Sequence, residues 1–174
     1  VLDGLSTYYT EDGVLAKRVL YKQDKKVAEE DYYSEQGKLK SKSKYSDTDE
    51  LIATIFYYDT GKIKENNKIT YQHTMKTEAK VSYYENGTMQ EKSENKQDPQ
   101  NKFYSRFSEY YDKQGKLTDR SEYINNQKNG LFMDSRSKII ENYKLGKLHG
   151  EYLYLDENNH ILEKGNYKEG KKIG

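Results

Sequence analysis

The chain has 174 residues, a length that suits one or two domains. It carries 30 basic and 29 acidic side chains, 19 tyrosines, no tryptophan and no cysteine. The near-zero net charge argues against non-specific nucleic-acid binding, which depends on phosphate neutralisation, and the missing cysteine excludes disulfides, thiolate catalysis and Cys-ligated metal sites.

Tyrosine doublets recur along the chain, and a turn sequence with glycine follows each of them. The doublets begin at residues 8, 32, 57, 83 and 110, so they stand 24 to 27 residues apart. The turn glycines are Gly13, Gly37, Gly61, Gly87 and Gly115. Glycine reaches positive φ without strain and is typical of hairpin turns. We therefore expect one β-hairpin after each doublet.

A second set of tyrosines lies between the doublets, at Tyr21, Tyr45, Tyr71, Tyr123, Tyr143 and Tyr167. An apolar residue two positions beyond the turn glycine stands an even number of residues before this tyrosine, as Leu15 does before Tyr21. Even spacing predicts that both side chains lie on one face of a strand. The sequence therefore predicts about seven units of two strands and two turns, with weaker copies around Phe132 and Tyr152, and very little helix.

The repeat weakens between residues 91 and 104, a stretch that contains the only proline of the chain. We expect an irregular or inserted segment there, within a single repeat domain that spans residues 1–174.

The pattern YKxGKxxG followed by YYxxGxL resembles MORN repeats, and more closely the bacterial MORN-variant proteins labelled YwqK-like antitoxins. The resemblance is strongest over residues 1–65, 80–90 and 105–174. It implies an all-β fold, an elongated single-layer antiparallel meander built from about seven MORN-like hairpin repeats. It also implies scaffolding or dimerisation, contact with anionic lipids or, for the YwqK-like proteins, neutralisation of a partner toxin.

Residue types with catalytic chemistry form no recognisable constellation in the sequence. His73, His149 and His160 share no metal-ligand spacing, and the glycines follow the turns rather than a phosphate-binding motif. We expect no enzymatic activity, no catalytic residue, no metal site and no cofactor.

Lysines alternate with other residues along one predicted strand. A lysine of another predicted strand falls on the same face. The predicted alternation places Lys40, Lys42 and Lys44 on the face opposite Leu39. It places Lys64 on the corresponding face one repeat later. The run is either a solvated face, paired with acids of neighbouring strands, or a basic groove for an acidic protein or an anionic membrane. Nucleic acid is not an expected partner.

Acidic residues recur two positions beyond the apolar residue that follows the turn. They are Glu65, Glu91, Asp119 and Glu163. They either accept hydrogen bonds from tyrosine hydroxyls and lysines of adjacent strands, or form, with an aromatic floor, a site for a basic or extended protein partner.

One ring of each doublet is expected to pack against the sheet, while the other stays exposed in a row that suits a protein interface. The candidate binding tyrosines are Tyr33, Tyr58, Tyr84 and Tyr111. The sequence thus predicts a non-enzymatic protein-binding module or scaffold, with a toxin-neutralising antitoxin or immunity protein and an anionic-lipid-associated scaffold as alternatives. The partner and the oligomeric state stay open. The expected location is the envelope or exterior of a bacterial cell if a signal segment preceded Val1, and otherwise the cytoplasm.

Overall fold

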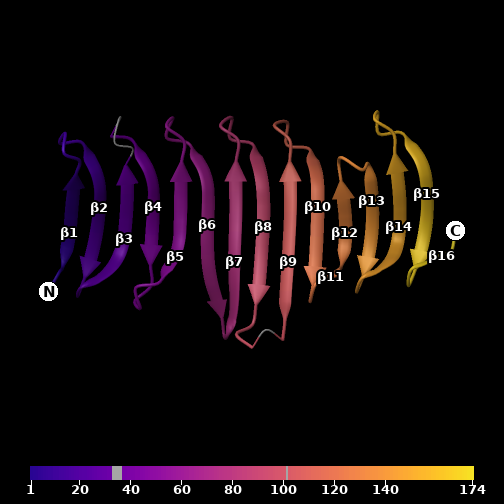
Figure 1. Cartoon of the computed structure of the whole chain (residues 1–174), viewed down its shortest axis with the longest axis horizontal. Coiled ribbons are helices and arrows are strands. Elements are labelled where there is room, and N and C mark those ends of the chain that lie inside the picture. The colour runs from indigo at the N-terminus through magenta and orange to yellow at the C-terminus, as the bar shows by residue number, and fades with distance from the viewer. Residues whose placement is uncertain (33–36, 101) are drawn as a thin grey trace. The chain divides into compact units, whose positions relative to one another are not determined.

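The structure is a computed structural model of the chain, and it describes residues 1–32, 37–100 and 102–174. Every regular element in these ranges is a β-strand (Figure 1). The strands are β1 Gly4–Tyr9, β2 Leu15–Lys22, β3 Lys25–Tyr32, β4 Leu39–Tyr45, β5 Leu51–Tyr57, β6 Ile63–Gln72, β7 Met75–Tyr83, β8 Met89–Gln97, β9 Tyr104–Tyr111, β10 Leu117–Ile124, β11 Gln127–Lys128, β12 Gly130–Asp134, β13 Ile139–Lys144, β14 Lys147–Leu155, β15 Ile161–Lys168 and β16 Lys171–Lys172. They pair in chain order as an open antiparallel meander, with β11 beside β10. The predicted all-β hairpin meander is therefore confirmed.

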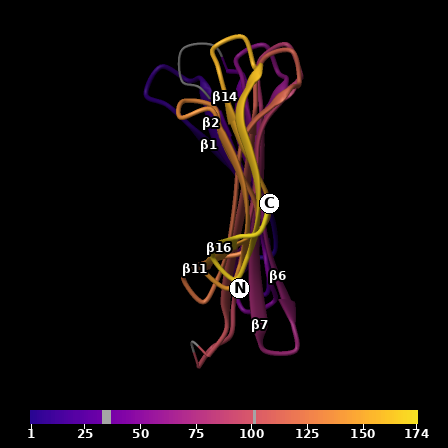
Figure 2. The ribbon, with the colours of Figure 1, turned by 90° about the vertical axis from the view of Figure 1, so that its right-hand side faces the viewer.

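The chain forms two compact units by its internal contacts. Unit 1 comprises residues 1–70 and 79–88, and unit 2 comprises residues 71–78 and 89–174. Unit 1 thus contains β1 to β5, most of β6 and the second part of β7, whereas unit 2 contains the tip of the β6–β7 hairpin and β8 to β16. Seen edge-on in Figure 2, the described strands of each unit form one layer.

A four-residue turn with two main-chain hydrogen bonds closes each of several hairpins. In the β5–β6 turn the Tyr58 N–H donates to the Lys62 carbonyl at 2.8 Å, and the Gly61 N–H donates to the Tyr58 carbonyl at 2.9 Å. Gly61 has a φ of 81°, in the left-handed region that favours glycine. The same pair of bonds recurs in the turns that begin at Thr10, Tyr84, Asp112 and Asp156. The turns predicted at Gly13, Gly61, Gly87 and Gly115 are therefore confirmed, whereas the turn before Gly37 lies outside the described residues.

A β-bulge recurs one step after these turns. In the β5–β6 pair, Tyr57 is opposite Ile63 while Phe56 is opposite Glu65, so Lys64 is the extra residue. Equivalent register shifts place Lys40 as the extra residue of β4 and Thr118 as that of β10. An extra residue breaks strict alternation, so the even spacing between the apolar residue and the later tyrosine does not carry both side chains to one face.

The interior of unit 1 is small and polar. Cross-strand pairing joins Val19, Glu29, Ser43, Thr54 and Asn67 in one row, which defines the valine face of unit 1. Val19 is only 2% exposed, and Ser43 and Thr54 are buried with their hydroxyls 3.3 Å apart. The sheet therefore buries its middle rows through short side chains and hydrogen bonds rather than through an aliphatic core.

The interior of unit 2 is aromatic. Phe132 of β12 is 9% exposed and contacts Tyr123 and Tyr143 edge to face, with ring centroids 5.3 Å and 5.2 Å apart. Such geometry is the preferred arrangement of aromatic pairs. These three rings define the tyrosine face of unit 2. Val19 and Phe132 are the buried hydrophobic residues of the described chain.

The segment 91–104 is more regular than its sequence suggests. Strand β8 runs to Gln97 and pairs with β9 residue by residue, from Glu91 opposite Tyr110 to Gln97 opposite Tyr104. The irregularity is confined to the connection 98–103, where Asp98 accepts a hydrogen bond from the Lys102 N–H at 2.6 Å; residue 101 lies outside the described part.

Candidate functional site

One face of unit 1 carries a set of cations, which we call the lysine face. Pairing aligns Arg18, Glu30, Lys42 and Ile55 across β2 to β5, on the face opposite Val19. A second row aligns Lys44, Ala53 and Lys68. Lys40 and Lys64 are the extra residues of their bulges, so alternation from Lys42 and from Asn66 does not place them on this face. The lysine face thus comprises Arg18, Lys42, Lys44 and Lys68.

Acidic residues are scarce on the lysine face. Among the described residues of strands β2 to β6, cross-strand pairing places one acid, Glu30, in these rows. Its carboxylate lies 2.8 Å from the Lys42 ammonium and 3.9 Å from the Arg18 guanidinium, and it accepts a 2.8 Å hydrogen bond from the Tyr32 hydroxyl. The bonds from Lys42 and Tyr32 lower the pKa of Glu30, and Glu30 in turn raises the pKa of Lys42.

The repeated bulges bring two of the candidate lysines together. Lys40 and Lys64, which stand one repeat apart, both line a shallow hollow of about 260 Å³ that also includes Phe56, Tyr57 and Glu65. The Lys64 ammonium also lies 5.8 Å from the ring of Tyr58. The hollow therefore combines basic, aromatic and acidic side chains.

The tyrosine doublets differ in their position relative to the turn that follows them. Tyr111 is the last residue of β9 and the turn begins after it at Asp112, whereas Tyr58 is itself the first residue of the β5–β6 turn. Tyr84 matches Tyr58, because its N–H and carbonyl close the β7–β8 turn. The second members of the doublets are therefore not equivalent positions.

The candidate binding tyrosines are engaged by neighbouring groups where the structure describes them. Tyr58 is half-buried and donates a 2.7 Å hydrogen bond to the Tyr83 carbonyl. Tyr111 donates at 2.8 Å to Glu109, and this bond raises its pKa. Tyr84 is half-buried in its turn. Tyr33 lies outside the described residues.

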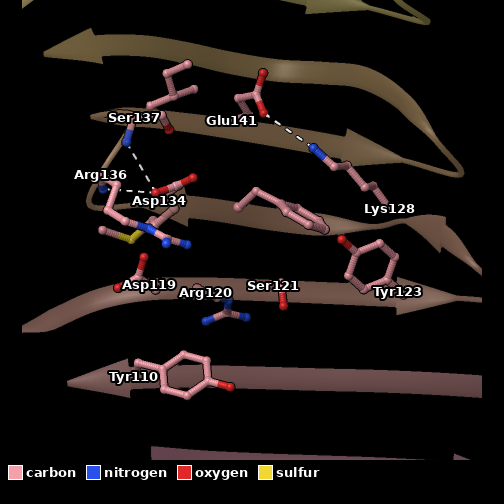
Figure 3. Close-up of a pocket in the computed structure, with 13 residues that line it drawn as sticks. Tyr110, Asp119, Arg120, Ser121, Tyr123, Lys128, Asp134, Arg136, Ser137 and Glu141 are labelled. Atoms are coloured by element: carbon pink, nitrogen blue, oxygen red, sulfur yellow. Dashed lines mark hydrogen bonds and ion pairs between the residues drawn. The ribbon is translucent and has the colours of Figure 1, made fainter.

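A pocket that the sequence did not suggest lies on the tyrosine face of unit 2 (Figure 3). It has a volume of about 390 Å³, and strands β9, β10, β12 and β13 contribute to its lining. We call it the aromatic pocket, and its main lining residues are Tyr110, Asp119, Tyr123, Phe132, Asp134 and Glu141. Tyr110 is 43% exposed, so the first member of this doublet, rather than Tyr111, offers its ring.

Lys128 occupies one end of the aromatic pocket. Its ammonium lies 4.8 Å from the ring centroid of Phe132 and 4.4 Å from that of Tyr143, with the Glu141 carboxylate at 3.7 Å. Burial opposes the charge of Lys128, but the hydrogen bond with the Tyr143 hydroxyl and the charge of Glu141 outweigh it and raise the lysine pKa.

Carboxylates from a strand and a turn line the other end of the pocket. Asp119 accepts hydrogen bonds from the N–H and hydroxyl of Ser135, and Asp134 accepts from the N–H groups of Arg136 and Ser137. The two main-chain bonds lower the pKa of Asp134, which stays ionised at neutral pH. Both main-chain bonds reach the same oxygen, Oδ1, and the Ser137 side chain also bonds to this carboxylate.

The acids that recur along the sequence contact lysines of adjacent strands or a nearby serine, and the lysine contacts are those of the first alternative. Glu65 pairs with Lys80 at 3.4 Å, Glu91 accepts from Ser93 at 3.1 Å, and Glu163 pairs with Lys172 at 3.4 Å. Asp119 is the member of this set that lines the aromatic pocket.

Metal-ligating residues do not cluster within the described ranges, where no group of three His, Cys, Asp or Glu could hold an ion. His160 lies in an exposed turn, with Nδ1 3.1 Å from Asp156, and the buried Nδ1 of His149 has no hydrogen-bond partner. None of the described elements is a helix long and apolar enough to cross a membrane.

The repeated hairpins define an all-β hairpin-repeat protein. Residues 2–23 and 148–169 match the MORN repeat variant family, and these two segments support a MORN-repeat protein. They contain the β1–β2 and β14–β15 hairpins, each with its second-set tyrosine.

Comparison with solved structures finds a protein of unknown function from Bacteroides fragilis. It is 14% identical, and the match covers 70% of this chain and 93% of that chain with a TM-score of 0.26, too low to carry an argument. No curated protein matches the chain.

Proposed function

We propose that this chain is a non-enzymatic repeat protein that binds another protein through the lysine face of unit 1. The observation that carries the proposal is the charge imbalance of that face, where the rows of the described strands set four cations, Arg18, Lys42, Lys44 and Lys68, against one acid, Glu30. A face whose charged side chains served solubility alone would be expected to carry basic and acidic residues in similar numbers, interspersed with one another.

The partner that fits this face is an acidic polypeptide segment with some apolar side chains. The cations stand on neighbouring strands, which lie about 4.8 Å apart, so successive carboxylates of an extended segment could meet them. Ile55 and Tyr57 lie among the cations and are half-buried, which leaves apolar surface for such a segment to cover. The net charge of +1 for the whole chain does not favour nucleic acid.

Neutralising a toxin would be one form of this binding. The resemblance of the repeat to YwqK-like antitoxins favours it, and such a toxin would have to present an acidic surface. Anionic membranes share the same charge chemistry and are separated from proteins by the test.

The test compares two charge-reversal variants. Arg18→Glu, Lys44→Glu and Lys68→Glu are combined in one variant of the lysine face. Lys144→Glu, Lys168→Glu and Lys171→Glu, which change exposed residues of unit 2, are combined in the matched control. A short labelled peptide that alternates glutamate with leucine is titrated with the wild type and both variants. We expect binding by the wild type and the control, weakened by salt, and its loss in the lysine-face variant.

Vesicles that contain phosphatidylserine provide the second arm of the test. Cosedimentation with vesicles, without peptide binding, would show a membrane-binding face instead. Equal peptide binding by all three proteins, or none by the wild type, would overturn the proposal.

A further inference from the structure

The aromatic pocket of unit 2 already accommodates one cation, the ammonium of Lys128. This ammonium lies within 5 Å of two ring centroids, at 4.8 Å from Phe132 and 4.4 Å from Tyr143. It also forms an ion pair with the carboxylate of Glu141 (Figure 3). Attraction between a cation and the face of an aromatic ring is strongest when water is partly excluded. Phe132 is 9% exposed, which meets that condition.

The arrangement recurs in unit 1, so it belongs to the repeat rather than to one residue. Lys26 is paired with Tyr21 and lies 5.4 Å from the ring of Tyr45, with the Glu29 carboxylate at 3.0 Å. Lys128 is likewise paired with Tyr123 and lies over Tyr143, the corresponding tyrosine of the next hairpin. A cation between an aromatic ring and a carboxylate is therefore a stable element of this fold.

The part of the pocket beyond Lys128 also combines aromatic rings with carboxylates. Tyr110 and Tyr123 contribute aromatic surface, and Asp119 and Asp134 contribute carboxylates (Figure 3). The Arg106 guanidinium lies 5.4 Å from the ring centroid of Tyr123, whereas Tyr110 is 43% exposed, so Tyr110 is the ring open to a ligand.

The charges at the Tyr110 end of the pocket favour a further cation. Asp119 and Asp134 are the carboxylates there, whereas Glu141 lies beside Lys128 at the other end. Arg120 also lines the pocket, but its guanidinium lies 2.8 Å from Glu109 and 5.2 Å from the ring of Phe107, both outside the pocket. Arg136 is the remaining lining cation near the two aspartates, so two carboxylates stand against one cation at this end.

We propose that the aromatic pocket of unit 2 binds an arginine side chain of a partner polypeptide. The planar guanidinium stacks on an exposed ring and donates hydrogen bonds to a carboxylate, which matches Tyr110 beside Asp119 and Asp134. This site is separate from the lysine face, whose proposed ligand is acidic, so a partner that uses both carries charges of both signs.

The experiment titrates the whole chain with a short peptide that carries one arginine among serines and glycines. The same peptide with citrulline, which keeps the shape and removes the charge, is the ligand control. Amide chemical shifts of unit 2 report the binding. We expect saturable shifts around Tyr123 and Phe132 with the arginine peptide, and an affinity at least about tenfold lower with citrulline.

Variants test the pocket independently of folding. Asp119→Asn combined with Asp134→Asn removes two charges and keeps the oxygen acceptors that hold the turn, so we expect affinity to fall about tenfold. The matched control combines Asp112→Asn with Asp156→Asn, because these residues accept main-chain N–H bonds in other turns and lie outside the pocket. We expect the control to bind like the wild type.

A gain of binding is expected when the internal cation is removed. Lys128→Met removes the ammonium that lies between Phe132 and Tyr143. One negative charge of the pocket then loses its internal cation, so the arginine peptide should bind more tightly. The lysine-face variant should bind this peptide as the wild type does, which separates the two proposals. Equal binding of arginine and citrulline peptides, equal losses in both aspartate variants, or no binding by the wild type would overturn the inference.

Discussion

The hydroxyl of Tyr58 donates a 2.7 Å hydrogen bond to the main-chain carbonyl of Tyr83. Tyr58 is the first residue of the β5–β6 turn, and Tyr83 is the last residue of β7, one repeat further along the chain. The turn of one hairpin is thereby tied to the strand end of the next. Lys62 reinforces the connection, because its ammonium donates to the Glu85 carbonyl at 2.9 Å.

This bond predicts a stabilising role for the Tyr58 hydroxyl. Tyr58→Phe keeps the ring and leaves a partly buried carbonyl without its donor, so the free energy of unfolding should fall by about 1 kcal/mol. Urea denaturation measures the change. Tyr9→Phe is the control, because Tyr9 is 63% exposed at the end of β1. A Tyr58→Phe variant that unfolds at the wild-type urea concentration would contradict the prediction.

The turn glycines allow a separate test of backbone strain. Gly61 has a φ of 81°, and a Cβ at this position would meet no atom within 4 Å. The variant Gly61→Ala therefore measures the free-energy cost of the positive φ without a steric clash. We expect a loss of about 1 kcal/mol, the cost of the left-handed region for a residue with a Cβ. Asn159 occupies the corresponding position of the β14–β15 turn with a φ of 65°.

The opposite substitution at Asn159 completes that test. Asn159→Gly relieves the same strain and should be neutral or slightly stabilising in thermal unfolding. A stabilised Gly61→Ala variant, or a strongly destabilised Asn159→Gly variant, would show that side-chain contacts rather than φ control these turns.

The turns could be predicted from the sequence because glycine spacing reports local backbone geometry. The two positions of the doublets relative to their turns could also have been predicted from the sequence. Tyr111 stands four residues before Gly115, whereas Tyr58 stands only three residues before Gly61. Since both turns span four residues, the shorter spacing places Tyr58 inside its turn.

The bulges and the aromatic pocket could not be predicted in the same way. No residue type marks Lys64 or Thr118 as extra residues, because a bulge depends on the register of two strands. The cation contacts of Lys26 and Lys128 join a lysine to a tyrosine in the next hairpin, at sequence separations that local periodicity does not report.

The carboxylate of Glu30 predicts an acid-sensitive contribution to stability. Its bonds to Lys42 and Tyr32 lower its pKa below the ordinary value of 4.5, so the folded state holds the proton less tightly than the unfolded state. The contribution is present above the unfolded pKa and is lost as pH falls through the lower, folded pKa. We expect Glu30→Gln to flatten the dependence of the melting temperature on pH below about 4.5.

The variant Lys42→Met provides the matching measurement, because it removes the largest cause of the shift and keeps Glu30. Its melting curve should also be less sensitive to acid than that of the wild type. If the melting temperatures of both variants fall with decreasing pH as steeply as that of the wild type, the pH dependence belongs to other carboxylates.

Phe132 should dominate the stability of unit 2, because it is the buried hydrophobic side chain of that unit within the described residues. Phe132→Ala removes its edge-to-face contacts with Tyr123 and Tyr143 and the ring beneath the Lys128 ammonium. The expected loss is about 3 to 5 kcal/mol. Leu162→Ala, at a residue of β15 that is 61% exposed, should change stability by less than about 0.5 kcal/mol. Hydrogen exchange distinguishes the two, since Phe132→Ala should abolish amide protection in β10, β12 and β13. Retained protection there would show that tyrosines and hydrogen bonds hold this sheet without its central phenylalanine.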